Sequence, residues 1–429
     1  MVPPGFHHVA IQWGIWRAGG IAVPLAVSHP PAELEHVIRD CDAEIVLAHP
    51  EFESTLRSIE PARRHASTAT AVTSAPRSPL PAPQPGRRAM IVYTSGTTGK
   101  PKGAVTTHGG LQAQVESLVA AWEWVAEDRI LLILPLHHVH GIVNVLTCAL
   151  WAGALCDMLP KFDAAKVWSR ITEGNLTVFM AVPTIYQRLI GAWDAATPEQ
   201  RVKMSGGCAK MRLMVSGSAA LPVSTLERWR EISGHTLLER YGMTEIGMAL
   251  SNPLRGERRP GTVGMPLPGV EVRLSGEGEI EVKGATVFLE YWGKPAETKA
   301  AFRDGWFRTG DVAVIESGYY RILGRSSTDI IKTGGYKVSA LEIEEVLRTH
   351  PLIAECAVVG VSDAEWGERI CAAVELRGGE LGLTELQAWA KERLAPYKVP
   401  RSLSCVVSLP RNAMGKVVKP DLAVWFRDR

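Results

Sequence analysis

Short apolar runs that each end in turn or polar residues recur along this 429-residue chain, and they constrain its fold more than any other feature. The runs are AMIVY (89–93), RILLILPL (129–136), LTVFMAVP (176–183), MRLMVSGSAAL (211–221) and TLLERYGMTE (236–245). Stretches with a helical pattern, such as GGLQAQVESLVAAWEW, lie between several of them. This alternation predicts an α/β fold in which a largely parallel sheet is covered by helices.

The second half of the chain changes pattern twice. After Gly261, the short alternating stretches VEVRL and GEIEVKG are typical of a β-rich subdomain. Near the end, a helix from about Ala340, strands at ECAVVGV and CAAVEL, and a helix at TELQAWAKERL indicate a small α+β domain. We expect a large N-terminal domain over residues 1–325 and a small, mobile C-terminal domain over residues 326–429.

One segment is expected to be a connector. Residues 66–86 read ASTATAVTSAPRSPLPAPQPG, a composition rich in Ala, Ser, Thr and Pro. Such a composition is typical of exposed flexible linkers. We therefore expect it to separate a short N-terminal piece from the rest.

The composition excludes several classes of protein. Hydrophobic residues make up 46% of the chain and charged residues 21%, which is the balance of a soluble globular protein. No apolar stretch has the length of a membrane span. The 47 Lys and Arg nearly balance the 45 Asp and Glu, so the net charge of +2 favours neither nucleic acid nor an anionic membrane as a partner. We expect small-molecule substrates, and the sequence does not indicate an oligomeric state.

The cysteines and the first residues bear on the compartment. The seven cysteines form no C-x-x-C pair and no metal-type spacing, which favours a reducing intracellular compartment, either mitochondrial or cytoplasmic. The start MVPPGFHHVAIQWGIW contains neither a basic and apolar secretory signal nor an Arg-rich transit peptide. The sequence therefore does not choose between the two compartments.

The loop YTSGTTGKPKG (93–103) is suited to hold a phosphate chain. Its glycines let backbone N–H groups approach an anion, its hydroxyls donate hydrogen bonds, and its two lysines add positive charge. Its place between a strand and a following helix is where α/β sheets bind ligands. A Walker P-loop is disfavoured, because Gly96 lies too close to Gly99 and Pro101 follows Lys100.

The loop resembles the phosphate-binding signature of the adenylate-forming superfamily, which comprises acyl-CoA synthetases, luciferases and peptide-synthetase adenylation domains. Further motifs follow in the superfamily's order: LPLHHVHG (134–141), GSAAL (217–221), ERYGMTE (239–245), WFRTGD (306–311), GRSSTDIIKTGGYKVS (324–339) and PRNAMGK (410–416). The amino-acid sequences of these motifs are most similar to those of malonyl-CoA synthetases. The resemblance covers the chain from about Val9 to Phe426. Family chains begin upstream of QWGIWRAGGIAVPL, so we expect the first strands and helices of the large domain to be absent.

The resemblance implies an ATP-dependent acid–thiol ligase that forms malonyl-CoA, and also methylmalonyl-CoA, through an acyl adenylate. It implies Mg²⁺ as the cofactor and CoA as a co-substrate. Two alternatives remain. One is a ligase for short- or medium-chain fatty acids, and the other is a truncated, non-catalytic nucleotide-binding protein.

The resemblance also implies an ATP site. Tyr241 would stack on adenine, Asp311 and Arg325 would bind the ribose hydroxyls, Thr244 would contact the α-phosphate, and Glu245 would hold Mg²⁺. The full set of implied ATP-binding residues is Thr94, Ser95, Gly96, Thr97, Thr98, Gly99, Lys100, Pro101, Lys102, Gly217, Ser218, Ala219, Tyr241, Thr244, Asp311, Arg325 and Lys416.

Lys416 is the expected catalytic lysine of the first step, and Thr244 is expected to act with it as a catalytic residue. The resemblance implies that Lys416 bridges the α-phosphate and the substrate carboxylate, a task that suits a compact point charge. It also implies that the C-terminal domain then rotates about residues 326–329. That rotation would bring Gly334 and Gly335 to the site, where a side chain would block the pantetheine of CoA.

Two further residues are expected at the acyl pocket. The resemblance places His138 there as a gate, although a packed structural histidine is an alternative. A metal site at His137, His138 and His140 is disfavoured, because no Cys or carboxylate lies near them in the sequence. Arg240 is expected to bind the second carboxylate of malonate, since a buried guanidinium is costly without an anion. Alternatively, Arg240 pairs with Glu239 or another carboxylate and points away from the substrate.

Overall fold

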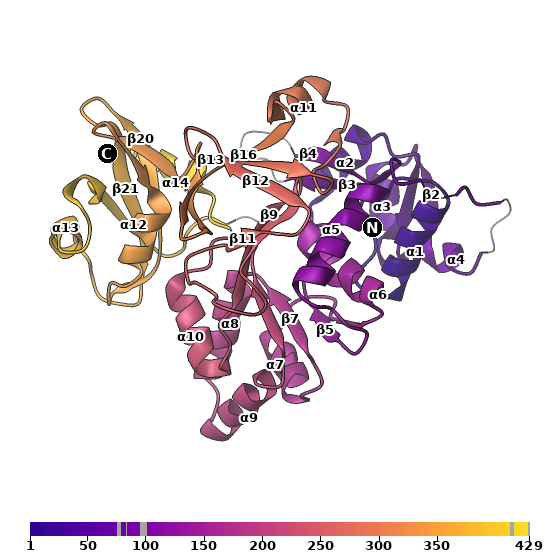
Figure 1. Ribbon diagram of the computed structural model, residues 1–429, viewed down its shortest axis with the longest axis horizontal. Coiled ribbons are helices and arrows are strands. Elements are labelled where there is room, and N and C mark those ends of the chain that lie inside the picture. Colours follow the sequence, from indigo (N-terminus) through magenta and orange to yellow (C-terminus); the bar gives the residue numbers. More distant parts are fainter. Residues whose placement is uncertain (75–78, 83, 95–100, 412–415, 428–429) are drawn as a thin grey trace.

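The computed structural model describes residues 1–74, 79–82, 84–94, 101–411 and 416–427 (Figure 1). Its centre is a seven-stranded sheet with the strand order β11-β10-β9-β8-β7-β5-β6. The strands are β5 (Arg129–Leu132), β6 (Leu155–Met158), β7 (Val178–Ala181), β8 (Leu213–Ser216), β9 (Leu238–Met243), β10 (Gly247–Ser251) and β11 (Met265–Pro266). Pairing is parallel from β6 to β9 and antiparallel at β10 and β11. The predicted α/β class and the four runs from residue 129 to residue 245 are confirmed.

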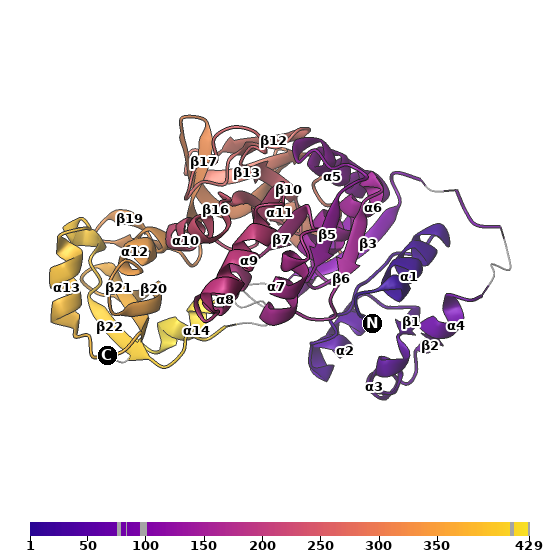
Figure 2. The ribbon, with the colours of Figure 1, turned by 90° about the horizontal axis from the view of Figure 1, so that it is seen from below.

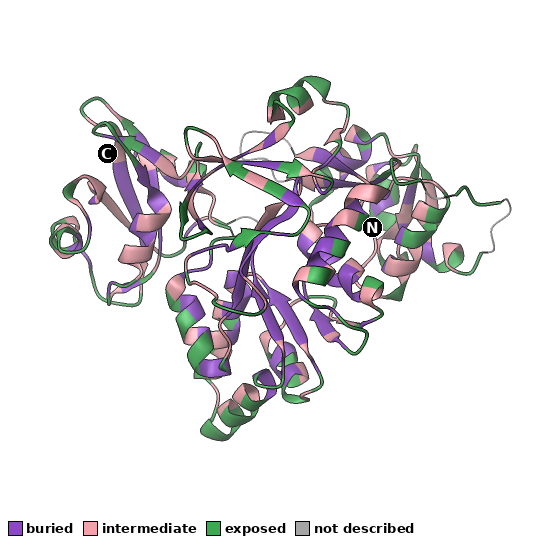
Figure 3. Ribbon diagram, viewed as in Figure 1, coloured by how far each residue is buried: buried purple, intermediate pink, exposed green. Residues whose placement is uncertain are grey.

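Helices cover this sheet, and three of them, α5, α7 and α9, start at a residue whose side chain caps the helix. The hydroxyl of Thr107 accepts a hydrogen bond from Gly110 N at the start of α5, and Thr197 forms a capping box with Gln200 at the start of α9. Strands β7 and β8 are buried at every residue, as Figure 3 shows at the centre of the molecule. The helices are α5 (His108–Ala121), η2 (His140–Thr147), α6 (Cys148–Ala152), α7 (Ala164–Thr172), α8 (Pro183–Asp194), α9 (Pro198–Cys208) and α10 (Val223–Ser233), of which η2 is a π-helix.

The N-terminal segment forms a small unit beside the sheet (Figure 2). It contains α1 (Phe6–Arg17), α2 (Pro31–Asp40), β1 (Ile45–Ala48), η1 (Pro50–Phe52), α3 (Glu53–Ile59), β2 (Arg64–Ser67) and α4 (Thr68–Ala71). The expectation of a connector over residues 66–86 is wrong at its start. Ala66 and Ser67 complete β2, which pairs in parallel with β1, and the next four residues form α4.

The phosphate-loop segment differs from the expected strand–loop–helix arrangement. Strands β3 (Arg88–Thr94) and β4 (Lys102–Thr107) pair antiparallel, so the loop connects a hairpin, and α5 starts only after β4. The run GAVTTH was not read as a strand, but tertiary pairing with β3 on one side and β14 (Glu290–Tyr291) on the other makes it one.

The expected β-rich subdomain is a sheet of β12 (Val270–Leu274), β13 (Glu279–Gly284), β16 (Trp306–Glu316) and β15 (Phe302–Arg303), with β17 (Tyr319–Arg325) also paired to β16. Helix α11 (Pro295–Ala301) precedes β15.

The C-terminal part lies at one end of the molecule and the N-terminal unit at the other (Figures 1 and 2). It has its own buried core around β20 and β21. Its elements are β18 (Ile330–Thr333), β19 (Tyr336–Ser339), α12 (Ala340–Leu347), β20 (Ile353–Asp363), β21 (Gly367–Leu376), α13 (Leu383–Lys391), η3 (Pro396–Lys398), β22 (Ser402–Val406) and α14 (Lys419–Val424). We propose that the domain boundary lies between residues 325 and 326, where β17 ends. Among the described helices, none has the length and apolar character needed to cross a membrane.

Candidate active site

Tyr241 lies 70 positions before Asp311 in the sequence, yet the two residues meet with Arg325 at one point of the fold. Asp311 on β16 is directly opposite Arg325 on β17, and the Arg325 Nε donates to Asp311 Oδ1 at 2.9 Å. The hydroxyl of Tyr241, near the end of β9, donates to Asp311 Oδ2 at 2.6 Å. The structure therefore brings together the residues predicted to bind adenosine.

The charges of this group support one another. Burial opposes the charged form of Arg325, but the hydrogen bond and charge of Asp311 outweigh it and raise the pKa of the guanidinium. Burial and the Asp311 carboxylate raise the pKa of the Tyr241 phenol well above its ordinary value, so the hydroxyl remains a donor. Each oxygen of Asp311 already accepts a protein donor, but a carboxylate oxygen has a second lone pair for a ribose hydroxyl.

The segment from Gly217 to Ala219 follows β8 and lies against Arg240. A Cβ added to Gly217 would be 2.5 Å from the Arg240 Cζ, so only glycine leaves room for the guanidinium there. Ser218 has a φ of +71°, a left-handed conformation that is uncommon outside glycine. Such strain is maintained where the surrounding structure fixes it, often at binding sites.

Arg240 is buried with only 3% of its surface exposed, and it forms no ion pair with any residue that the structure describes. Its Nη2 lies 3.5 Å from Ser218 Oγ, and its Nε has no hydrogen-bond partner among the described residues. Burial lowers the pKa of Arg240, and the charge of Glu239 only partly opposes this.

The neighbouring Glu239 does not supply the missing counter-charge. Its Oε1 accepts a hydrogen bond from Leu221 N at 3.1 Å, while its Oε2 has no partner within the described part of the chain. Burial raises the pKa of Glu239 to about 8, so the carboxyl group is largely protonated at neutral pH. The guanidinium of Arg240 is therefore buried without a full negative charge beside it.

The histidines of LPLHHVHG border the same region. His140 is buried, and its Nδ1 lies 3.1 Å from Ser218 Oγ. The rings of His137 and His138 are in contact, with centroids 4.1 Å apart. Burial lowers the pKa of His138 to about 4, assisted by the charge of Lys416, so the imidazole is neutral at pH 7. Over the described residues, no group of His, Cys, Asp and Glu has a metal-binding arrangement.

Lys416 comes from the C-terminal part of the chain and reaches this region. Although the residue retains exposed surface, surrounding protein atoms displace water from its ammonium and lower its pKa. The positive charges of Arg325 and Arg240 lower the pKa further, and the carboxylate of Asp311 opposes them. The charge of Lys416 thus interacts with the Asp311–Arg325 pair, with Arg240 and with His138.

The phosphate loop is described only at its two ends. Ser95, Gly96, Thr97, Thr98, Gly99 and Lys100 lie outside the described residues. At one end, Thr94 Oγ1 donates to Lys102 O at 3.4 Å, and at the other the carbonyl of Pro101 lies 3.1 Å from the His36 Nε2. The ammonium of Lys102 pairs with Glu297 at 2.6 Å.

Glu245 and Thr244 follow β9 directly. The carboxylate of Glu245 is buried, its Oε1 accepts a hydrogen bond from the Tyr291 hydroxyl at 2.9 Å, and burial raises its pKa. No lysine or arginine that the structure describes forms an ion pair with Glu245. A buried carboxylate beside a hydroxyl-bearing residue fits a hard cation such as Mg²⁺, which prefers oxygen ligands.

Gly334 and Gly335 form the turn between β18 and β19, with φ angles of +54° and +82°. A Cβ at Gly334 would meet the Trp366 ring at 3.3 Å, whereas a Cβ at Gly335 would have no atom within 4 Å. Gly334 N donates to Trp366 O at 2.9 Å, so this turn packs within the C-terminal part of the chain, whereas Lys416 reaches the adenosine side in this arrangement.

The sequence did not single out every residue that takes part in these contacts. Tyr291 and Glu297, which bind Glu245 and Lys102, lie outside any recognisable motif. His140 and Ser218 lie within recognised motifs, but they are 78 positions apart, and only the fold brings them together. The fold also places Ser218 beside Arg240. Only the cost of burying a guanidinium, which is visible from the residue type, pointed toward this group.

Two family models match the chain. The model of the AMP-binding enzyme matches residues 1–292, and that of the AMP-binding enzyme C-terminal domain matches residues 342–416.

Relatives with named activities match over nearly the whole chain. The mitochondrial malonate–CoA ligase ACSF3 of Bos taurus is 48% identical, over 96% of this chain and 78% of its own length. The crystal structure of ATP-bound MatB from Rhodopseudomonas palustris matches with a TM-score of 0.91 and 35% identity, over 100% of this chain and 88% of that one. A malonyl-CoA ligase complex with methylmalonyl-CoA and AMP bound matches with a TM-score of 0.70 and 39% identity, over 95% and 89% of the two chains.

Proposed function

The chain belongs to the AMP-binding enzyme family, and from this premise we propose that it is an AMP-forming acid–thiol ligase that makes malonyl-CoA from malonate, ATP and CoA. In the first step, a malonate oxygen attacks the α-phosphorus of ATP and pyrophosphate leaves. In the second, the sulfur of CoA attacks the acyl carbon and AMP leaves. Methylmalonate is a further substrate, in keeping with the relative whose complex holds methylmalonyl-CoA and AMP.

Arg240 is the residue that selects malonate as the substrate. A buried guanidinium that lacks a full counter-charge is costly, and the free carboxylate of malonate would supply that charge with two parallel hydrogen bonds. Ser218, whose Oγ lies beside both Arg240 Nη2 and His140 Nδ1, would donate its hydroxyl hydrogen to the same carboxylate. A fatty acid would leave the guanidinium unpaired, so the geometry disfavours the fatty acyl-CoA ligase.

The Tyr241–Asp311–Arg325 group would bind the adenosine part of ATP. Tyr241 would stack on adenine beside Gly217–Ala219, and Asp311 with Arg325 would bind the ribose. Thr94, Pro101 and Lys102, with the loop between them, would bind the β- and γ-phosphates. Lys102 would exchange its partner Glu297 for a phosphate, since exposed ion pairs are weak.

Lys416 would serve the first step from its position near Arg325 and Asp311. Its ammonium would bridge the α-phosphate and the attacking carboxylate, where it stabilises the charge that spreads over the transferring group. The neutral imidazole of His138 would border the acid without adding charge. Thr244 would donate to the α-phosphate, and Glu245 would hold Mg²⁺, which supplies charge neutralisation on the phosphate oxygens.

The arrangement of the chain fits the step before CoA arrives. Its TM-score is higher with the ATP-bound relative than with the relative that holds methylmalonyl-CoA and AMP. Gly334 and Gly335 would reach the site after rotation of the C-terminal domain about residues 326–329. For the compartment, we propose the mitochondrion, because the named animal relative is mitochondrial.

The test is a pyrophosphate-release assay with ATP and a panel of malonate, methylmalonate, butyrate and octanoate, followed by mass detection of the CoA thioester. We expect malonate to give the highest kcat/KM and the product malonyl-CoA. Preference for butyrate or octanoate would favour the fatty acyl-CoA ligase. ATP binding without pyrophosphate release for any acid would favour the non-catalytic protein.

A further inference from the structure

Lys419 is a buried lysine that lies three residues after Lys416, in the first turn of α14. Its side chain is 13% exposed, and its Nζ lies 2.5 Å from Asp329 Oδ1 and 2.8 Å from Glu344 Oε1. Burial opposes the charged form of Lys419, but the carboxylates of Glu344 and Asp329 outweigh it and raise its pKa. The ammonium therefore stays charged and held by two carboxylates over the whole neutral range.

Each carboxylate ties Lys419 to a different element. Asp329, between β17 and β18, uses its other oxygen to accept a hydrogen bond from Arg325 N at 3.0 Å. Glu344 on α12 accepts a hydrogen bond from Val358 N of β20 at 2.8 Å. The lysine thus joins α14 both to the core of the C-terminal part and to the segment that carries Arg325.

The loop that carries Lys416 is closed just before this point. Arg411 and Val417 form a β-bridge, and Val418 N donates to Pro410 O at 2.8 Å. Downstream, Leu422 and Phe426 are fully buried against β20 and β21. The Lys419 ion pair with Asp329 therefore gives the end of this loop a polar attachment to residues 325–329.

A continuous series of contacts leads from Lys419 to the adenosine side. Asp329 holds the backbone of Arg325, the Arg325 side chain pairs with Asp311, and Asp311 accepts the hydroxyl of Tyr241. Lys416 lies within electrostatic reach of Arg325 and Asp311 at the other end of the same loop. The distance between the Lys416 ammonium and the Asp311–Arg325 pair therefore depends on the contacts of Lys419 as well as on those of Arg325.

We infer that Lys419 is a positioning residue for Lys416: its ion pairs with Asp329 and Glu344 fix the loop of Lys416 against the segment that carries Arg325, in the arrangement that performs adenylation. This inference rests on the proposed function. Lys419 itself touches neither substrate nor the reacting atoms, and it acts through the placement of Lys416. Because Lys416 is needed only for the first step, the loss of Lys419 should affect the two half-reactions unequally.

The test measures the two half-reactions separately in the full chain. Adenylation is followed as pyrophosphate release with malonate and ATP in a single turnover, and thioester formation is followed from supplied malonyl adenylate and CoA. We expect Lys419→Met to slow adenylation by about a hundredfold, the scale of a displacement of about 1 Å at a reacting group, while thioester formation changes by less than about threefold. Lys419→Arg, which keeps the charge, should restore most of the adenylation rate.

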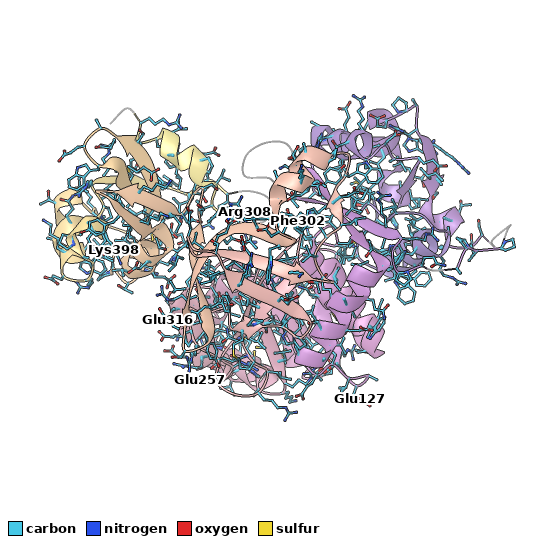
Figure 4. The ribbon with its side chains drawn as sticks, turned by 45° about the horizontal axis from the view of Figure 1, so that its top comes forward. Glu127, Glu257, Phe302, Arg308, Glu316 and Lys398 are labelled. Carbon is cyan, nitrogen blue, oxygen red and sulfur yellow. The ribbon has the colours of Figure 1, made fainter. Side chains whose placement is uncertain are left out.

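Two further variants keep the test decisive. Asp329→Asn is nearly isosteric, and if Lys419→Met does not fold, Asp329→Asn should still slow adenylation selectively. Lys398→Met is the matched control, because Lys398 (Figure 4) is 20% exposed and its Nζ lies 2.5 Å from Oε1 of Glu342 on the same helix α12, rather than beside Asp329 or Glu344. It should leave both half-reactions unchanged.

Equal loss of both half-reactions in the folded Lys419→Met and Asp329→Asn variants would show a merely structural cluster and overturn the inference. Unchanged adenylation in either variant would also overturn it. These results are distinct from failure of the proposed function, in which the unmodified chain would release no pyrophosphate with malonate.

Discussion

The guanidinium of Arg240 and the hydroxyl of Ser218 lie side by side, with Nη2 and Oγ 3.5 Å apart, and His140 Nδ1 approaches the same hydroxyl to 3.1 Å. Ser218 has the left-handed φ of +71°, and the Nε of Arg240 has no partner within the described part of the chain. A strained backbone at Ser218 beside an incompletely paired guanidinium is typical of a functional site, and the guanidinium favours a small anion there.

Replacement of Arg240 should separate a dicarboxylate from a monocarboxylate. We expect Arg240→Ala to lower kcat/KM for malonate by about a hundredfold or more, the scale of a buried charged pair that loses one partner. The kcat/KM for butyrate should fall little or rise, because butyrate has no second carboxylate for the guanidinium to bind. The measurement is kcat/KM for both acids at saturating ATP and CoA.

A second arginine serves as the control for that prediction. Arg258 is partly buried and donates to the carbonyls of Thr236, Pro253 and Leu254, so it has a structural role. Arg258→Ala should change the two acids in parallel. A parallel fall for malonate and butyrate in Arg240→Ala would show instead that Arg240 supports the fold or the nucleotide.

Lys416→Ala should abolish adenylation and spare thioester formation from a supplied acyl adenylate, since the positive charge is needed only when the α-phosphate is attacked. Both half-reactions are measured in single turnovers with the same enzyme preparation. An equal loss in both would show that Lys416 contributes to the fold or to nucleotide binding in general.

Adenylation should also decline on the alkaline side at an unusually low pH. The protein atoms around the ammonium and the charges of Arg325 and Arg240 lower the pKa of Lys416, so the ammonium loses its proton at a lower pH than that of a fully hydrated lysine. Because the charged form is the active one, the rate should be full below this lowered pKa and fall as the pH rises through it. A pH profile of the thioester step should lack this decline, and its presence in both steps would contradict the assignment.

Much of the fold was predictable because apolar runs and turn residues are local signals. Strands β5, β7, β8 and β9 coincide with four of the runs read from the sequence. The hairpin β3–β4 was missed because β4 depends on pairing with β3 and β14 rather than on its own pattern. Helix α4 was missed because its composition, TATA, is that of a linker.

The candidate site was predictable as a set of residue types but not as a set of contacts. The family resemblance implied ribose binding by Asp311 and Arg325, but only the β16–β17 register shows that the two residues face each other. Similarly, the sequence raised Glu239 as a partner for Arg240, and only the burial of both residues shows that the carboxyl group is largely neutral. The pairs of Lys419 with Asp329 and Glu344 span 90 positions at the most and carry no local signal.

Glu245→Gln should raise the Mg²⁺ concentration needed for half-maximal adenylation by about tenfold or more, because the variant keeps the shape but loses the charge that a hard cation prefers. The control is Glu297→Gln, whose carboxylate pairs with Lys102 rather than lying beside Thr244. Since burial raises the pKa of Glu245, the Mg²⁺ requirement of the unmodified enzyme should also increase as the pH falls through that raised value. An unchanged Mg²⁺ titration for Glu245→Gln would remove Glu245 from the metal site.

The glycine turn should matter for the thioester step alone. In the present arrangement, a side chain at Gly335 would project into open space, so Gly335→Leu costs the folded protein only the strain of the left-handed φ of +82°, about 1–2 kcal/mol. Adenylation should therefore proceed normally, whereas the bulky side chain should obstruct CoA once the turn reaches the site and lower the thioester rate by at least about a hundredfold. Gly335→Ala carries the same strain with little bulk, so it should retain most of the thioester rate if bulk is the cause. If Gly335→Leu transfers CoA normally, or if Gly335→Ala is as defective as Gly335→Leu, the turn does not form the wall of the CoA path.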